Sequence, residues 1–337
     1  MISAFSSVVG HNLQVAALKE MHSRGRIPHA LLFIGPSGVG KRTVAHAFAE
    51  ELLCGSDESS NDESTSSLFK VGNHPDFHIA FREEGKRDLP VETIRTLCGK
   101  LQLKPYYGRN TLAIIDAAET MNIAASNALL MTLEEPVQNT YIILVTSAPQ
   151  RLPETIVSRC QKLQFGGLTK SELMEVIARV LGPIISAETQ KALVEFCENS
   201  LAPLSLDRFT APRTLRLENE KECALHLEQF LSTVRNMEEQ FESFCNTASR
   251  DLNNGASHAA LLATALTGDK EREPLVWQTM HRVLRSRMRS GSNEEKGRWA
   301  NALLSSLEAE QLCRERNTSS QLQLGSVMLG TLLGKVD

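Results

Sequence analysis

The residues with the clearest chemistry lie between a short apolar run and a helical segment. Residues 31–34 (Leu-Leu-Phe-Ile) precede the loop 35–41 (Gly-Pro-Ser-Gly-Val-Gly-Lys), and a run with helical spacing of its apolar residues follows from 42 to 53. The backbone N–H groups of such a loop, at the start of a helix, bind phosphate oxygens, and the lysine reaches the terminal phosphates. The predicted phosphate contacts are Gly35, Gly38, Gly40 and Lys41. The alternative is a glycine-rich turn that keeps its shape without a nucleotide.

A magnesium ion is harder to place beside this loop. The residue after the lysine is normally a Ser or Thr whose hydroxyl binds the metal, whereas this chain has Arg42 there and Thr43 one residue later. One helical step turns a side chain by about 100°, so the Thr43 hydroxyl should point away from the metal unless the loop shifts register. The apolar run 112–115 ends at Asp116, a second candidate ligand. The candidate cofactor is therefore ATP or ADP with magnesium, held in part by Thr43 and Asp116.

The residues after Asp116 argue against efficient hydrolysis. Hydrolytic enzymes of this type place a glutamate next to the aspartate to orient water, but here Ala117 follows, and Glu119 comes too late. Two of the parts on which phosphoryl transfer depends are thus missing. Nucleotide binding stays open, and efficient catalysis by the isolated chain is not expected. Thr146 or Ser147, at the end of a later apolar run, is either a polar nucleotide sensor or a helix cap.

The elements that must position these residues alternate between short apolar runs and helical periods. This rhythm predicts an α/β domain with a mostly parallel five-stranded sheet and helices on both faces. The candidate strands are 30–34, 77–81, 111–115, 141–146 and 162–165. Between the first helix and the second strand, the acidic, Ser-rich segment 55–67 has no large apolar side chain. It is predicted to be a mobile, solvated loop with nothing to bury, or else an acidic recruitment segment.

Only helical patterns follow Gly166 and Gly167. A helix pair is predicted at 170–181 and 187–197, with Thr169 as N-cap and Glu172 three residues on. Residues 201–219, interrupted by two prolines, read as a linker. Apolar stripes then predict a helical bundle. The stripe residues are Leu227, Phe230, Leu231, Val234, Met237, Phe241, Phe244, Trp277, Met280, Leu284 and Met288.

Composition excludes several classes of protein. The 337 residues are 42% hydrophobic and 23% charged, unlike disordered or collagen-like chains. The 36 Lys and Arg against 40 Asp and Glu give a net charge of −4, which excludes a histone-like protein. The start lacks a signal-peptide pattern and no apolar run approaches a membrane span. The seven cysteines include no CxxC pair, so a disulfide framework is not indicated. A cytoplasmic protein without membrane contact is expected.

Four runs give the chain a family resemblance over roughly its first half. These are 26–36 (RIPHALLFIGP), 73–77 (NHPDF), 127–136 (NALLMTLEEP) and 155–160 (TIVSRC). Together they resemble the AAA+ clamp-loader subunits. The resemblance implies three domains: an AAA+ P-loop domain at 1–166, a small helical lid at 167–212 and a helical collar for oligomerisation at 213–337.

The resemblance also implies a function for Arg159. In the run Ser158-Arg159-Cys160, the arginine would enter the ATP site of an adjacent motor subunit as an arginine finger. Such a finger is worth about 10³ to 10⁵ in rate. The alternative is a surface arginine whose stem packs over the last strand. Cys160 is expected to be a small packed residue rather than a reactive thiol.

The implied assembly is a hetero-pentameric ring of clamp-loader subunits of the bacterial replicative DNA polymerase. Its other members are ATPase motor subunits and a clamp-opening subunit, and the ring acts on the sliding clamp and primer-template DNA. Two functions are open: a non-motor subunit that donates Arg159, or an ATP-hydrolysing motor or standalone AAA+ remodeller that uses Lys41, Thr43 and Asp116. Arg42 and Ala117 favour the first.

Departures from the family pattern limit what carries over. Family members often have a zinc-binding cysteine cluster after the first helix, but Cys54 stands alone there and zinc is not expected. The expected lid arginine is missing until Arg208. Three arginines on one predicted helix face, Arg282, Arg285 and Arg289, form either a solvated face opposite the Trp277 stripe or a contact for an acidic partner or phosphate backbone.

Overall fold

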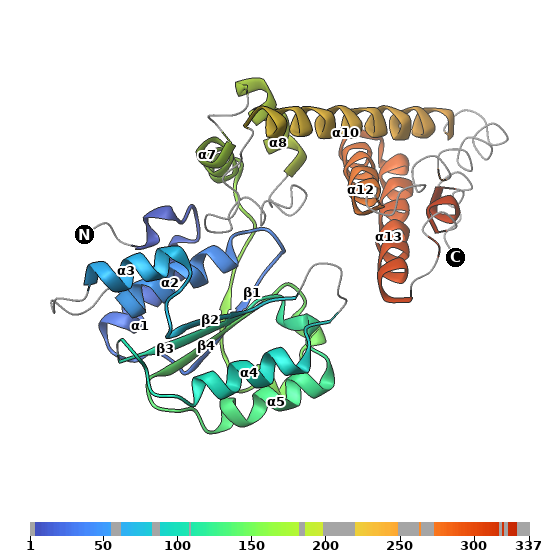
Figure 1. Ribbon diagram of the computed structural model, residues 1–337. Helices are drawn as coiled ribbons and strands as arrows, with labels where there is room; N and C mark the ends of the chain where they lie inside the picture. The colour runs from blue at the N-terminus through green and yellow to red at the C-terminus, as the bar shows by residue number, and fades with distance from the viewer. Residues whose placement is uncertain are drawn as a thin grey trace. The chain divides into compact units, whose positions relative to one another are not determined.

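The computed structural model (Figure 1) describes residues 4–54, 62–82, 88–107, 109–181, 186–197, 220–248, 263, 273–316, 319 and 323–328. The chain forms two compact units, residues 1–218 and 219–337. The finer division at 166 and 212 stays a prediction. Within the described residues, no helix combines the length and apolar character needed to cross a bilayer.

A five-stranded parallel sheet forms the centre of the first unit. Its strands are β1 (Ala30–Ile34), β2 (Phe77–Ala80), β3 (Thr111–Ile115), β4 (Thr140–Thr146) and β5 (Gln161–Gln164). They lie in the order β2-β3-β4-β1-β5, and every neighbouring pair is parallel. The predicted α/β class and sheet are therefore confirmed, with strand ends shifted by no more than one residue.

Helices cover both faces of the sheet (Figure 1). Leu32 and its equivalents in β3 and β4 pack toward α4 (Val91–Leu101) and α5 (Ile123–Glu134). Phe33 points the other way and joins a cluster with α1 (Asn12–Ser23) and α2 (Lys41–Cys54). Because successive side chains of a strand point to opposite faces, every residue of β1 and β3 is buried, and all but Thr111 are apolar.

The predicted solvated loop 55–67 is wrong over its second half. Helix α3 (Asp62–Val71) begins within it, and residues 55–61 lie outside the described residues. Thr65 and Phe69, one helical turn apart, are both buried, and Phe69 belongs to the core cluster on the α2 side of the sheet. A tertiary anchor thus stabilises a Ser- and Thr-rich segment whose own helix propensity is low.

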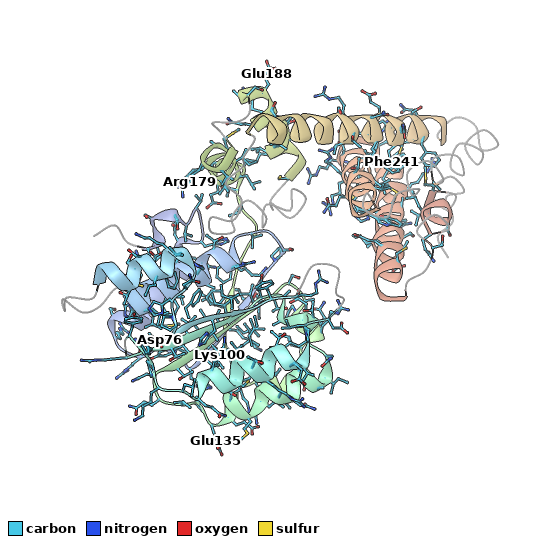
Figure 2. All side chains as sticks on the ribbon, in the orientation of Figure 1. Asp76, Lys100, Glu135, Arg179, Glu188 and Phe241 are labelled. Atoms are coloured by element: carbon cyan, nitrogen blue, oxygen red, sulfur yellow. The ribbon has the colours of Figure 1, made fainter. Side chains whose placement is uncertain are left out.

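Short elements and a helix pair complete the described part of the first unit. The short helices are η1 (Ala4–Ser7), η2 (Ala118–Thr120), η3 (Pro149–Arg151) and α6 (Glu154–Val157). The pair is α7 (Lys170–Leu181) and α8 (Ala187–Cys197), with the predicted bounds. The Thr169 N–H donates to Glu172 Oε2 over 2.7 Å, which confirms the predicted capping box. Arg179, labelled in Figure 2, donates to the Ser7 carbonyl and joins α7 to η1.

The second unit is helical in its described residues. It contains α10 (Glu220–Ala248), α12 (Glu273–Ser290) and α13 (Asn293–Arg316). Most stripe residues whose side chains are described belong to one core cluster with Met288 at its margin: Met237, Phe241, Phe244, Trp277, Met280 and Leu284. Val234 is buried as well. The linker 201–219 and the side chains of Leu227, Phe230 and Leu231 lie outside the described residues.

The predicted basic face of α12 is wrong for Arg282. Its side chain is only 20% exposed and forms an ion pair with Glu238 of α10. Arg287, five residues further along α12, pairs with Glu242 of α10. Helix α12 thus uses these arginines to bind α10, and Arg289 remains exposed.

Candidate functional site

The phosphate-loop candidate, residues 35–41, connects β1 to α2 at the carboxyl end of the sheet. A Cβ atom at Gly35 would lie 2.4 Å from the carbonyl oxygen of Phe165, so only glycine fits there. Gly40 has φ +101°, a backbone conformation that L side chains rarely adopt. Gly38 has φ +69°. These glycines therefore allow the loop to turn sharply into α2.

Lys41 bends back onto its own loop. Its side chain is buried, and Nζ donates to the carbonyl oxygens of Gly35 and Pro36 over 2.7 and 2.6 Å. Charge-assisted hydrogen bonds of this length are strong. The ammonium group thus holds the loop together, and a phosphate would have to compete for it.

Arg42 lies against the carboxylate that the sequence offers to a metal. Its Nη1 is 3.4 Å from Asp116 Oδ2, with the Arg42 side chain 37% and the Asp116 side chain 23% exposed. The Thr43 side chain, one residue further along α2, is exposed. A protein cation therefore balances Asp116, and no hydroxyl follows Lys41 directly. These residues do not fit a magnesium ion, which prefers oxygen ligands.

The segment after Asp116 is occupied by its own hydrogen bonds. Ala117 has φ +48°, and its N–H donates to Asp116 Oδ1 over 3.0 Å. Glu119 accepts from the Ser147 hydroxyl over 2.6 Å. Burial would raise the pKa of Glu119, but hydrogen bonds led by that of Ser147 outweigh burial and lower the pKa. The Thr146 hydroxyl accepts from the Ala148 N–H over 3.1 Å, the kind of contact a capping side chain makes.

Arg159 lies in the turn between α6 and β5. Its Nη2 is 2.7 Å from Glu134 Oε1, and its Nη1 donates to the Thr155 carbonyl oxygen over 2.9 Å. The Arg159 side chain is 36% exposed, so the guanidinium is both held and accessible. Cys160, by contrast, is buried, and burial raises its pKa to about 11. Its thiol is protonated at neutral pH and does not supply a nucleophile.

The structure brings the predicted residues together in two places. The loop residues and Asp116 meet through Arg42, whereas Arg159 meets Glu134. The sequence reasoning missed both ion pairs. For the Arg159–Glu134 pair the sequence offered one signal: the runs 127–136 and 155–160, which contain these residues, both carry the family resemblance.

Two further points concern the predicted lid segment and metal binding. The lid segment 198–208, including Arg208, lies outside the described residues. Within the described residues, no group of three or more His, Cys, Asp or Glu side chains could hold a metal ion.

The chain is similar to known proteins over roughly its first half. A family model described as "DNA polymerase III, delta subunit" matches residues 10–169. DNA polymerase III subunit delta' of Pseudomonas aeruginosa is 34% identical over 200 residues, 58% of this chain and 60% of the relative. The delta' subunit of Bacillus subtilis is 30% identical over 203 residues, 59% of this chain and 60% of the relative.

A solved structure extends the likeness in fold. A DNA polymerase III gamma subunit-related protein of Thermotoga maritima superimposes with a TM-score of 0.51 at 18% identity, covering 95% of this chain and 99% of that one. At this identity the likeness concerns the fold alone. The chain spans about three-fifths of the length of the two delta' relatives.

The parallel sheet, the glycine loop before α2 and the acidic end of β3 define an AAA+ P-loop domain. Over residues 10–169 this domain is similar to the DNA polymerase III delta-subunit family, and its relatives include delta' subunits.

Proposed function

We propose that this chain is a delta-prime-type clamp-loader subunit of the bacterial replicative DNA polymerase. The family match and the delta' relatives support this assignment. In this proposal the chain works in the cytoplasm in a hetero-pentameric ring with ATPase motor subunits and a clamp-opening subunit. The ring loads the sliding clamp onto primed DNA.

The Arg42–Asp116 contact carries the proposal that the chain is not itself a motor. A guanidinium lies where a metal would be needed, at 3.4 Å from Asp116. Ala117 stands where a water-orienting carboxylate would be required. ATP or ADP, if bound by this loop, meets Lys41 and the backbone N–H groups without the usual metal ligands. The loop then serves mainly as a scaffold.

Arg159 is the residue through which the chain takes part in chemistry. Its guanidinium is partly exposed at the end of α6 and would stabilise the charge that develops on the γ-phosphate in a neighbour's site. The reacting phosphate and its metal belong to that neighbour. This chain contributes the positive charge and the surface that presents it.

Reconstitution of the complete loader tests the proposal. Replacement of Arg159 by Ala should slow turnover at the adjacent site by about 10³ to 10⁵ while the ring still assembles. Arg151, an exposed arginine in η3, provides the matched control, and Arg151→Ala should retain activity. Normal turnover with Arg159→Ala would refute the finger. Brisk magnesium-dependent hydrolysis by the purified chain alone would instead favour the motor or standalone remodeller.

A further inference from the structure

Glu134 and Arg159 meet at the surface of the AAA+ domain although they come from different elements. Glu134 is the last residue of α5, and Arg159 follows α6. We propose that Glu134 is a positioning residue that orients the Arg159 guanidinium for the neighbouring ATP site. This inference rests on the proposed function of Arg159 as a finger.

Two contacts fix the plane of the guanidinium. Glu134 Oε1 binds Nη2 at 2.7 Å, and the Thr155 carbonyl oxygen accepts from Nη1 at 2.9 Å. A guanidinium has five N–H donors in a planar fork. One acceptor would leave the plane free to turn about the contact, whereas two acceptors from different elements define its orientation. The remaining N–H donors of the Arg159 guanidinium then point in a fixed direction, toward the position proposed for the neighbour's phosphate.

The location of Glu134 also argues for a role outside its own helix. A carboxylate in the last turn of α5 lies at the negative end of the helix dipole, where it is unfavourable. The Glu134 carboxylate instead lies at salt-bridge distance from the Arg159 guanidinium. The side chains are 36% and 50% exposed, and ion pairs so accessible to water contribute little to stability. Orientation is therefore the property that depends most on this contact.

Pre-orientation raises the rate because a flexible arginine must otherwise be ordered when the transition state forms. Long side chains lose substantial rotamer entropy on ordering, and a preorganised group has met that cost beforehand. The carboxylate also offsets part of the finger's charge. We expect the orientation effect to exceed this loss, because an exposed pair is screened by water.

Kinetics of the reconstituted loader test the inference with three variants of this chain. Glu134→Ala should lower kcat for ATP by about three- to tenfold, up to about 1.4 kcal/mol, and leave KM within about twofold. Glu134→Gln keeps an oxygen acceptor and should restore most of the rate. Glu135→Ala is the matched control, since Glu135 is the adjacent exposed carboxylate labelled in Figure 2, and it should behave as the wild type.

The double variant separates positioning from a structural role. If Glu134 acts through Arg159, then Glu134→Ala should cause no further loss in an Arg159→Ala background. A further loss there, or wild-type or faster turnover in Glu134→Ala alone, overturns the positioning role. If Arg159→Ala is slow and Glu134→Ala is not, only this inference fails. If Arg159→Ala itself turns over normally, the proposed function fails and this inference with it.

Discussion

Arg42 Nη1 lies 3.4 Å from Asp116 Oδ2, which joins the first turn of α2 to the end of β3 across 74 residues of sequence. The contact places a fixed positive charge beside the carboxylate that a P-loop domain would otherwise offer to a metal. A divalent cation arriving there would meet charge repulsion and would have to displace a guanidinium. The contact thus supports the proposal that this chain is not itself a motor.

Restoring a hydroxyl at this position should restore metal-dependent binding. In Arg42→Thr the residue after Lys41 regains an oxygen ligand, and Asp116 is released from its cation. We expect magnesium to increase the affinity for ATP by about tenfold or more, or about 1.4 kcal/mol, whereas it should have little effect on the wild type. Isothermal calorimetry with and without magnesium measures the difference.

The control for this gain is the double variant Arg42→Thr with Asp116→Asn. It keeps the new hydroxyl but loses the carboxylate, so most of the magnesium effect should disappear. A wild-type chain that already shows a strong magnesium effect would contradict the role given to the Arg42–Asp116 pair.

Lys41 should matter more for stability than for clamp loading. Its Nζ is buried and donates to the Gly35 and Pro36 carbonyl oxygens. Lys41→Ala removes both bonds, and we expect the free energy of unfolding to fall by about 1–3 kcal/mol. Loader activity below the unfolding transition should remain near wild type. Chemical denaturation and a clamp-loading assay measure the two effects.

The exposed Lys104 supplies the comparison for Lys41. Lys104→Ala should change stability by less than about 0.5 kcal/mol. Loss of clamp loading in a folded Lys41→Ala chain would mean that nucleotide binding by this loop is required.

The sequence was informative wherever a single segment carried its own pattern. Strand β1 is apolar at every position and β3 at every position after Thr111, because both faces of the sheet are covered, so their ends could be placed to the residue. Helix α3 could not be predicted in this way. Its Ser and Thr residues favour turns, and Phe69 becomes an anchor only once the α2 side of the sheet exists.

The site was predictable in its parts but not in its contacts. The glycine loop and Asp116 could each be predicted from the local sequence pattern. The Arg42–Asp116 and Arg159–Glu134 pairs, in contrast, join residues that are distant in sequence. Their pairing depends on strand order and on the direction of each helix end. No spacing rule within one segment contains that information.

Three histidines of the first unit, which lie on different faces of the sheet, should make stability depend on pH. Burial lowers the pKa of His46, His74 and His78 below the ordinary value of 6.5. The His46 ring packs edge-on against Phe69 and Phe77, with ring centroids 4.8 and 5.3 Å apart. These rings are neutral in the folded chain under conditions in which the unfolded chain binds protons.

The free energy of unfolding should therefore fall as the pH falls below about 6.5, because the unfolded state then binds more protons than the folded state. Each such histidine adds a slope of up to about 1.4 kcal/mol per pH unit until its folded pKa is reached. His46→Phe keeps an aromatic ring between Phe69 and Phe77 but removes one titrating group, so its stability should decline less steeply. Urea denaturation between about pH 7.5 and pH 5 measures both profiles. Parallel profiles would show that His46 titrates alike in the folded and unfolded chains, in which case its burial has no effect on its charge.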